Sequence, residues 1–227
     1  MPAGTITALR AQAQDSQRVN VFVDNEFAIG ISLTTLGRER LFVGKVLTDE
    51  DYARLEQAEH TDKAIQAALR FLEARPRSAA EIRERLQRKD FSAEAIDQAL
   101  ERMRELGLTD DAAFARFWVE NRQNSRPRGA AALRDELRRK GLDRSLIDDV
   151  LSDEELTGDE QSSAWTQARA ALRKYANAPD KATFTRRMGG YLQRRGFGFD
   201  TIRPVIDQLW REIAGQSDQE DEYTSNA

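Results

Sequence analysis

The chain has 227 residues, of which 33% are charged and 7% aromatic, and its formal net charge is −4. This balance is typical of a helical protein with a modest core, and the overall acidity argues against a polybasic nucleic-acid binder. With no Cys and a single His, the chain excludes disulfides and thiolate nucleophiles and leaves almost no ligands for a transition metal.

Targeting and membrane signals are absent from the sequence. No run of about 18 apolar residues exists that could span a membrane. The first residues lack the basic and then apolar stretch of a secretion signal. We therefore expect a protein of the cytoplasm that makes no contact with a membrane.

Residues 1–47 carry the pattern of a small β-structure. The stretch 18–23 alternates apolar and polar residues, and a second apolar stretch occupies 26–31. Between them lies Asp24-Asn25, a pair that tolerates the positive φ of a tight turn. Residues 5–9 predict a further strand. An N-terminal β-hairpin or meander is expected.

From residue 48 onward the pattern is helical, and helix boundaries recur along it. Thr48 before three acidic residues predicts a helix start, and Ser78 with Glu81 predicts a capping box. Further polar residues precede periodic apolar stretches and predict starts, and glycines after helical stretches predict ends. The further starts are Ser92, Asp143 and Asp200, and the ends are Gly107, Gly141 and Gly196.

One short signature occurs three times, as Leu-Gln-Arg-Lys-Asp-Phe, Leu-Arg-Arg-Lys-Gly-Leu and Leu-Gln-Arg-Arg-Gly-Phe. Its leucines are Leu86, Leu137 and Leu192. Apolar residues recur four positions before each leucine and ten and fourteen after it, which is helical spacing on both sides of a short turn. These residues are Ile82, Ile96 and Leu100, then Leu133, Ile147 and Leu151, then Met188, Ile202 and Ile206. Chance similarity among Arg-rich helices does not explain so many matches.

Each signature is preceded by a further apolar helix, so the repeating unit is a helix-turn-helix-like module of three helices. Stacking on a neighbour is the expected source of stability for a unit of about 50 residues. The fold class is therefore mainly α, with a tandem array of three repeats behind the β-region. The expected segments are 1–47 (β-hairpin region), 48–108 (linker helix and repeat 1), 109–156 (repeat 2), 157–214 (repeat 3) and 215–227 (disordered acidic tail).

The middle helix of each repeat is the basic one. Windows 75–89 and 126–140 each hold six basic and two acidic residues, and window 181–195 holds five basic and none acidic. Such helices could follow a phosphate backbone or an acidic groove. Stabilisation of helix C-termini is the alternative, but it does not cover cations further up each helix. The candidate binding residues are Arg83, Arg88, Lys89, Arg134, Arg138, Arg139, Lys140, Arg187, Arg194 and Arg195.

Signatures of catalysis are weak throughout the chain. His60 lies between Glu59 and Thr61, where a solvated or capping role is favoured over a ligand or base. The glycines at 189–190 and 196–198 match neither a Walker loop nor a dinucleotide fingerprint. Acids at 110–111 open a predicted helix, where the helix dipole accounts for them, and acids at 148–149 fall early in another. Neither pair favours a catalytic or metal-binding role. We predict no enzyme, no cofactor and no metal.

Four elements of the sequence, in order, resemble the RecX family of bacterial recombination regulators. The elements are Phe-Leu-Glu-Ala-Arg-Pro-Arg-Ser-Ala-Ala-Glu-Ile-Arg-Glu-Arg-Leu at 71–86, Gly-Leu-Thr-Asp-Asp-Ala-Ala-Phe-Ala at 107–115, the Leu-x-x-Lys-Gly-Leu stretch at 137–142, and Tyr-Leu-Gln-Arg-Arg-Gly-Phe at 191–197. The resemblance spans about residues 64–210, and it is the ordered set that is specific. The β-region resembles the N-terminal extension of longer members.

The resemblance implies a modulator of the RecA recombinase. Members bind the RecA filament on single-stranded DNA, lie along its helical groove and inhibit strand exchange, ATP hydrolysis and co-protease activity. It therefore implies a role in DNA repair by homologous recombination and in the SOS response, with RecA as partner, direct contact with the single-stranded DNA open, and a monomeric chain. Asp90 departs from the pattern, since the other two repeats have Gly141 and Gly196 there, so the first turn is expected to differ.

Two other functions fit the residues. Each module has the helix count of a stand-alone helix-turn-helix DNA binder, with Arg-rich helices for phosphate contacts, although the overall acidity argues against it. A scaffold for another helical partner would use the same arginines in salt bridges. A response to RecA distinguishes a RecA modulator from a stand-alone DNA binder and from a scaffold.

Overall fold

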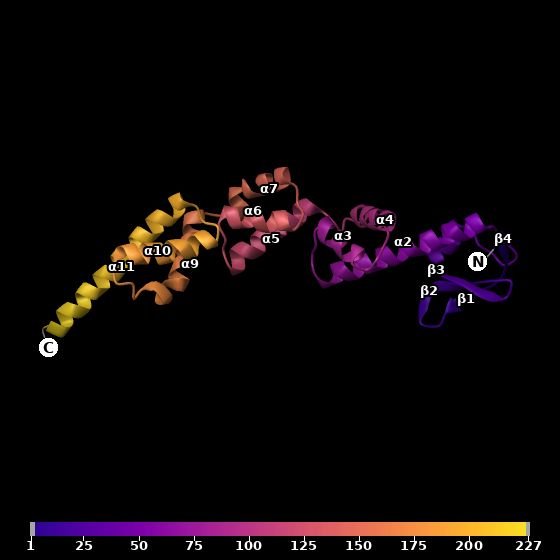
Figure 1. Cartoon of the computed structure of the whole chain (residues 1–227), viewed down its shortest axis with the longest axis horizontal. Helices are drawn as coiled ribbons and strands as arrows, with labels where there is room; N and C mark the ends of the chain where they lie inside the picture. Colours follow the sequence, from indigo (N-terminus) through magenta and orange to yellow (C-terminus); the bar gives the residue numbers. More distant parts are fainter. Residues whose placement is uncertain (1–2, 226–227) are drawn as a thin grey trace. The chain divides into compact units, whose positions relative to one another are not determined.

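The computed structural model describes the backbone of residues 3–225 and the side chains of residues 3–214. The chain divides into two compact units, one ending at Asp110 and the other starting at Asp111. Figure 1 shows a small sheet in the first unit and helices in the rest of the described chain. Each unit is described by itself.

The first unit begins with an antiparallel sheet of order β3-β2-β1-β4. Its strands are β1 (Gly4–Gln12), β2 (Asp15–Val23), β3 (Glu26–Ser32) and β4 (Val46–Leu47). Asp24 and Asn25 form the predicted tight turn, with φ of 49° and 70°. Two elements were not predicted, the short helix α1 (Leu33–Arg38) and the two-residue strand β4.

A single helix, α2 (Asp49–Ala74), connects the sheet to the first repeat. Thr48 caps its start, as the sequence predicted, and it also forms a capping box with Asp51. Its Leu55 belongs to the core of the sheet, whereas Ala64 and Ala68 belong to the core of repeat 1. The predicted linker helix and the first helix of repeat 1 are thus one continuous element, because no Gly or Pro interrupts it.

Every repeat has the predicted three helices. Repeat 1 uses the end of α2 with α3 (Ala79–Gln87) and α4 (Ala93–Glu105). Repeat 2 comprises α5 (Asp111–Ser125), α6 (Ala130–Arg139) and α7 (Arg144–Leu151), followed by a single turn, α8 (Glu154–Thr157). Repeat 3 comprises α9 (Glu160–Tyr175), α10 (Lys181–Arg194) and α11 (Phe199–Ser225).

Each repeat buries its own apolar cluster, and the predicted apolar positions form its centre. Leu86, Leu137 and Leu192 are fully buried, one in each cluster. The positions four before and ten after each leucine are also buried; of those fourteen after, only Leu151 is half-buried. The periodicity of the sequence therefore identified the core of all three modules.

The turn of the first repeat corrects an expectation. Asp90 has φ of 60°, close to the 78° of Gly141 and the 86° of Gly196. All three turns therefore have a residue in the left-handed conformation at the same position. Asp is among the few side chains that enter this region at moderate cost. The backbone of the turn is thus maintained without glycine.

This geometry makes Asp90→Gly a stabilising change. Glycine enters the left-handed region without the steric cost of a Cβ, so the free energy of unfolding should rise by about 0.5–1 kcal/mol. Urea unfolding measures it, with Asp90→Ala as the opposite control because alanine pays the steric cost without a compensating polar contact. Equal stability of the two variants would contradict the shared turn.

The last helix differs from the prediction for the end of the chain. α11 continues to Ser225, through most of the segment 215–227 that the sequence predicted to be disordered. A helix already anchored by a packed first half needs no new nucleation, so polar residues can extend it. Residues 226–227 lie outside the described part of the chain.

Candidate functional site

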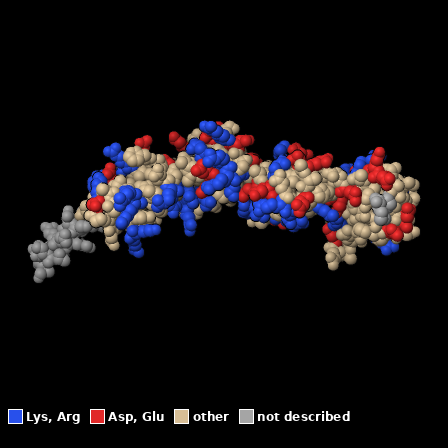
Figure 2. All heavy atoms as spheres, viewed as in Figure 1, with Lys and Arg blue, Asp and Glu red and all other residues tan. Residues whose placement is uncertain are grey.

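The ten candidate binding residues lie on the second helix of each repeat or at its C-terminal end. Seven side chains are exposed, and Arg83, Lys140 and Arg195 are half-buried. Figure 2 shows Lys and Arg side chains gathered on both three-helix repeats of the second unit. The basic character predicted for these helices is therefore present at the surface of each module.

Two of these arginines make the same ion pair in successive repeats. Arg83 Nη2 lies 2.7 Å from Asp97 Oδ1, joining α3 to α4. Arg134 Nε lies 3.2 Å from Asp148 Oδ1, joining α6 to α7. Exposed pairs of this kind contribute little to stability and exchange readily for other partners.

The cations at the C-terminal ends of the helices have local contacts. Arg88 pairs with Glu84 one turn earlier, and Arg138 pairs with Asp135. Arg139 Nε donates to the carbonyl of Asp135, 3.2 Å away. These contacts fit the stabilisation of helix ends that the sequence offered as an alternative.

The next cation along is held against an aromatic ring in repeats 2 and 3. Lys140 Nζ lies 4.6 Å from the centre of the Trp118 ring, and the Arg195 guanidinium lies 4.9 Å from that of Tyr191. Such contacts orient a cation without neutralising it. An aromatic ring thus orients each of these two cations.

Three of the ten have side chains that make no ion pair, hydrogen bond or ring contact within the described residues: Lys89, Arg187 and Arg194. Arg194 occupies the repeat position of Arg88 and Arg139, by the spacing of the leucines. Arg187 lies two positions before that of Arg83 and Arg134, so it is not their equivalent. The third repeat therefore presents its cations in a different pattern from the first two.

A buried carboxylate organises repeat 2, and no pattern in the sequence indicates it. Glu136 is 8% exposed and accepts from Trp118 Nε1 at 2.8 Å and from Arg122 Nε at 2.7 Å. Arg128 Nε lies 3.3 Å from its other oxygen. Arg122 and Arg128 are consequently directed toward Glu136 and are not available to bind a partner of the basic helix.

Repeats 2 and 3 are in direct backbone contact within the second unit. The N–H of Gly129 donates to the carbonyl of Arg195 at 3.0 Å, and a Cβ on Gly129 would overlap the backbone of Gly196. Glu160 bridges the same junction, accepting from the N–H of Ala130 at 3.1 Å and from the hydroxyl of Thr201 at 2.9 Å. Direct packing of successive modules is thus observed for this pair.

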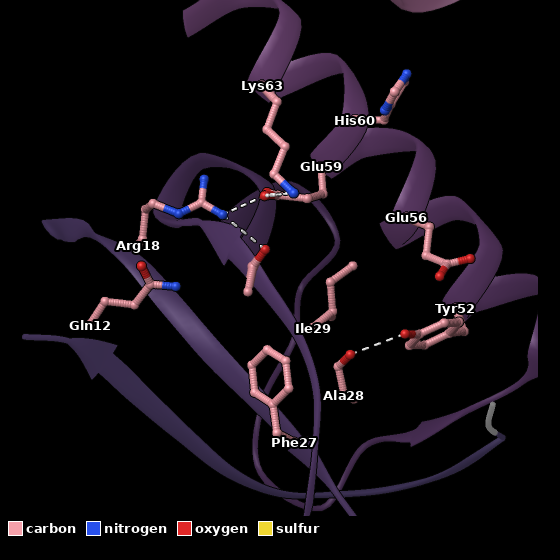
Figure 3. Close-up of a pocket in the computed structure, with 11 residues that line it drawn as sticks. Gln12, Arg18, Phe27, Ala28, Ile29, Tyr52, Glu56, Glu59, His60 and Lys63 are labelled. Atoms are coloured by element: carbon pink, nitrogen blue, oxygen red, sulfur yellow. Dashed lines mark hydrogen bonds and ion pairs between the residues drawn. The ribbon is translucent and has the colours of Figure 1, made fainter. Parts of the chain in front are cut away.

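A polar pocket of 480 Å³ lies between the sheet and α2 (Figure 3). Arg18 and Lys63 both point at Glu59, which is 4% exposed; the Arg18 contact is a short ion pair and Lys63 Nζ lies 3.2 Å away. The Tyr52 hydroxyl donates to the carbonyl of Ala28 at 3.1 Å. These contacts attach the sheet to the helix, and they give the pocket a structural role.

The single histidine also has a structural role. His60 lies inside α2, and its Nε2 accepts from the N–H of Ser92 at 3.1 Å. Its ring lies 5.1 Å from that of Phe91. His60 therefore satisfies a free donor at the start of α4, as a capping residue does.

The described residues lack two further kinds of feature. They contain no group of three or more His, Asp or Glu side chains positioned to hold a metal ion. They also contain no helix with the length and apolar character needed to cross a bilayer.

Fold and surface together define a class: helical-repeat proteins whose modules each carry a basic second helix, preceded by a small antiparallel sheet. Four family models match in chain order: the Regulatory protein RecX N-terminal domain at residues 4–48, and the first, second and third RecX three-helix domains at 64–103, 110–151 and 159–206. The chain belongs to the RecX family of regulatory proteins.

Individual relatives support this assignment. "Regulatory protein RecX" of Bacillus subtilis (strain 168) is 30% identical over 217 residues, covering 96% of this chain and 81% of the relative. The same-named protein of Clostridium acetobutylicum is 30% identical and covers 93% and 99%. A crystal structure of regulatory protein RecX has a TM-score of 0.76 and 26% identity, covering 89% and 98%.

A second solved structure shows the same fold. The crystal structure of RecX from Lactobacillus salivarius has a TM-score of 0.58 and 23% identity, covering 67% of this chain and 97% of the other. The relatives are named as regulatory proteins, a description that suggests a role other than catalysis.

Proposed function

We propose that this protein binds the RecA filament on single-stranded DNA along its helical groove and inhibits strand exchange, ATP hydrolysis and co-protease activity. The observation that carries the proposal is family membership over four consecutive domains. The three basic helices supply the physical means, because a filament that contains DNA presents phosphates and acidic surface to any ligand in its groove.

The repeated cation at the end of each second helix is the best candidate contact. Arg88, Arg139 and Arg194 occupy the same position in the three modules and are all exposed. Arg88 and Arg139 make only local, weak contacts, and the Arg194 side chain makes none within the described residues. Each guanidinium can therefore turn to a new acidic partner or phosphate at little cost. Three equivalent contacts spaced along one chain add to affinity through a high effective concentration.

Reversal of all three charges tests this contact. The variant Arg88→Glu, Arg139→Glu, Arg194→Glu should weaken inhibition of the DNA-dependent ATPase of RecA by roughly 100-fold, because attraction becomes repulsion at each module. Circular dichroism should remain helical. The measurement is the concentration of protein that halves ATP hydrolysis, with strand exchange as a second readout.

The matched control makes the same change in net charge at exposed arginines away from the second helices, as Arg38→Glu, Arg104→Glu, Arg173→Glu. It should inhibit within about threefold of the unaltered protein, since only distant screened charges change. Equal loss in both triple variants would mean that net charge alone acts. An unaltered protein that leaves RecA activity unchanged at micromolar excess would contradict the proposal.

Stand-alone DNA binding is the competing outcome of the same experiments. It would appear as tight, salt-dependent binding to naked DNA with no effect of RecA on affinity. The formal net charge of −4 makes this outcome unfavourable. Capture of another helical partner and no RecA would point to the scaffold reading.

A further inference from the structure

The third repeat departs from the first two at one pair of positions. The register of the leucines places Gly189 where repeats 1 and 2 have Arg83 and Arg134. The same register places Arg203 where they have Asp97 and Asp148. The interhelical ion pair that joins the second and third helices of the earlier repeats is therefore absent from repeat 3, and a single cation remains.

A groove of 540 Å³ lies between α10 and α11 at this place. Gly189 and Gly190 contribute no side chains to it, and Ile202 and Ile206 lie below. A Cβ on Gly189 would lie 3.4 Å from Cδ1 of Ile206, an ordinary van der Waals contact. The base of the groove is thus aliphatic.

The rims of the groove are positively charged. Arg186 and Arg203 line it, both exposed, and neither makes an ion pair within the described residues. The acid among the lining residues, Asp207, has its Oδ1 2.8 Å from Lys181 Nζ. The hydrogen bond from Lys181, with the nearby charge of Arg203, holds the pKa of Asp207 below its ordinary value. The groove therefore combines an apolar floor with a positive field.

A large aromatic residue also lines this groove. Phe199, the first residue of α11, is 74% exposed. Phe197, two residues earlier in this chain, is buried in the core of the repeat, so the two rings have different roles. An exposed aromatic beside an apolar hollow and a charged rim is typical of a surface that binds another chain.

We propose that this groove binds an acidic peptide segment of a partner protein. One large apolar side chain of the peptide lies on Ile202 and Ile206, and carboxylates on either side face Arg186 and Arg203. The complementarity of charge and the aliphatic floor favour a peptide. Single-stranded DNA fits less well, because the Asp207 carboxylate among the lining residues would repel phosphates and the aliphatic floor suits an apolar side chain.

The proposal goes beyond regulation of RecA and does not depend on it. Binding is measured by fluorescence anisotropy with the full chain alone and a labelled twelve-residue peptide of Asp, Glu and Ser around one central Phe. We expect a dissociation constant in the micromolar range. Replacing the Phe of the peptide by Ala should weaken binding at least tenfold, and added salt should weaken it further.

Two variants of the protein test the groove itself. Gly189→Arg with Arg203→Asp introduces the residues of repeat 2, restores the ion pair and fills the groove, so affinity should fall at least tenfold. Arg186→Glu with Arg203→Glu keeps the space and reverses only exposed rim charges, with the same expected loss and no threat to folding. The control Arg173→Gln, an exposed change on α9, should leave affinity unaltered.

Three results would overturn the proposal. The first is peptide affinity unchanged in both groove variants. The second is a labelled twelve-nucleotide oligothymidine that binds in a variant-sensitive way while the peptide does not bind. The third is self-association of the chain that both variants abolish, which would make a second copy the occupant. Because the assay contains neither RecA nor, in its main arm, DNA, any of these leaves the proposed regulation of RecA standing.

Discussion

Gly129→Ala should separate repeat 2 from repeat 3. The added methyl group would overlap the carbonyl of Gly196 and lie 2.5 Å from the backbone nitrogen of Phe197. All of these neighbours are backbone atoms, which cannot rotate away as a side chain does. Relief requires the modules to move apart and to lose the hydrogen bond from Gly129 to Arg195. We expect the free energy of unfolding to fall by about 3 kcal/mol.

Backbone conformation does not complicate this experiment, because Gly129 has φ of −71°, which any residue adopts. The matched control is Gly190→Ala, the same methyl group added inside α10 of the same unit. Its nearest neighbour would be the flexible end of Arg194 at 3.3 Å, and alanine favours a helix, so stability should hold or rise by about 0.5–1 kcal/mol. Urea unfolding of both variants gives the comparison. Equal stability of Gly129→Ala and the unaltered chain would contradict the close approach of the two repeats.

Glu136→Leu should destabilise repeat 2 strongly. Leucine removes the acceptor of the Trp118 N–H and of the Arg122 guanidinium, and the ion pair with Arg128 as well. The Trp118 N–H and the guanidiniums would then lose their acceptor, and partly buried charges without a partner are costly. Both arginines keep about a third of their side chains exposed, which limits the cost. We expect a loss of about 3 kcal/mol in the free energy of unfolding.

The adjacent acid provides the control. Asp135 lies on the same helix, but its pair with Arg138 is exposed on both sides, at 58% and 73%. Asp135→Leu should therefore cost less than about 1 kcal/mol. Thermal unfolding followed by circular dichroism compares the two. Similar destabilisation by both changes would mean that burial of Glu136 carries no special weight.

The sequence predicted the repeats well because their physics is local. Leu86, Leu137 and Leu192, with their apolar neighbours at helical spacing, report a helix face directly, and the left-handed turn after each second helix follows from Gly141 and Gly196. Asp90 was misjudged because residue identity suggested a different turn, while the packing of the flanking helices enforces the same one. Short elements such as β4 have too few residues to produce any periodic signal.

The charged residues could be counted from the sequence but not paired. Glu136 looks like any acid on a basic helix until Trp118 and Arg122 are brought to it from α5. Likewise, the pairing of Arg83 with Asp97 depends on the packing of two helices, which no spacing along one helix reveals. The sequence therefore located the basic helices, whereas the structure identifies which cations remain available on them.

An image of the RecA filament on single-stranded DNA with this protein bound tests the central proposal most directly. We expect additional density that follows the helical groove, into which the modules fit with α3, α6 and α10 facing RecA or DNA. The same image with the Arg88→Glu, Arg139→Glu, Arg194→Glu variant should show bare filaments. Density confined to filament ends, or bound protein whose second helices face solvent, would contradict the proposed binding along the groove.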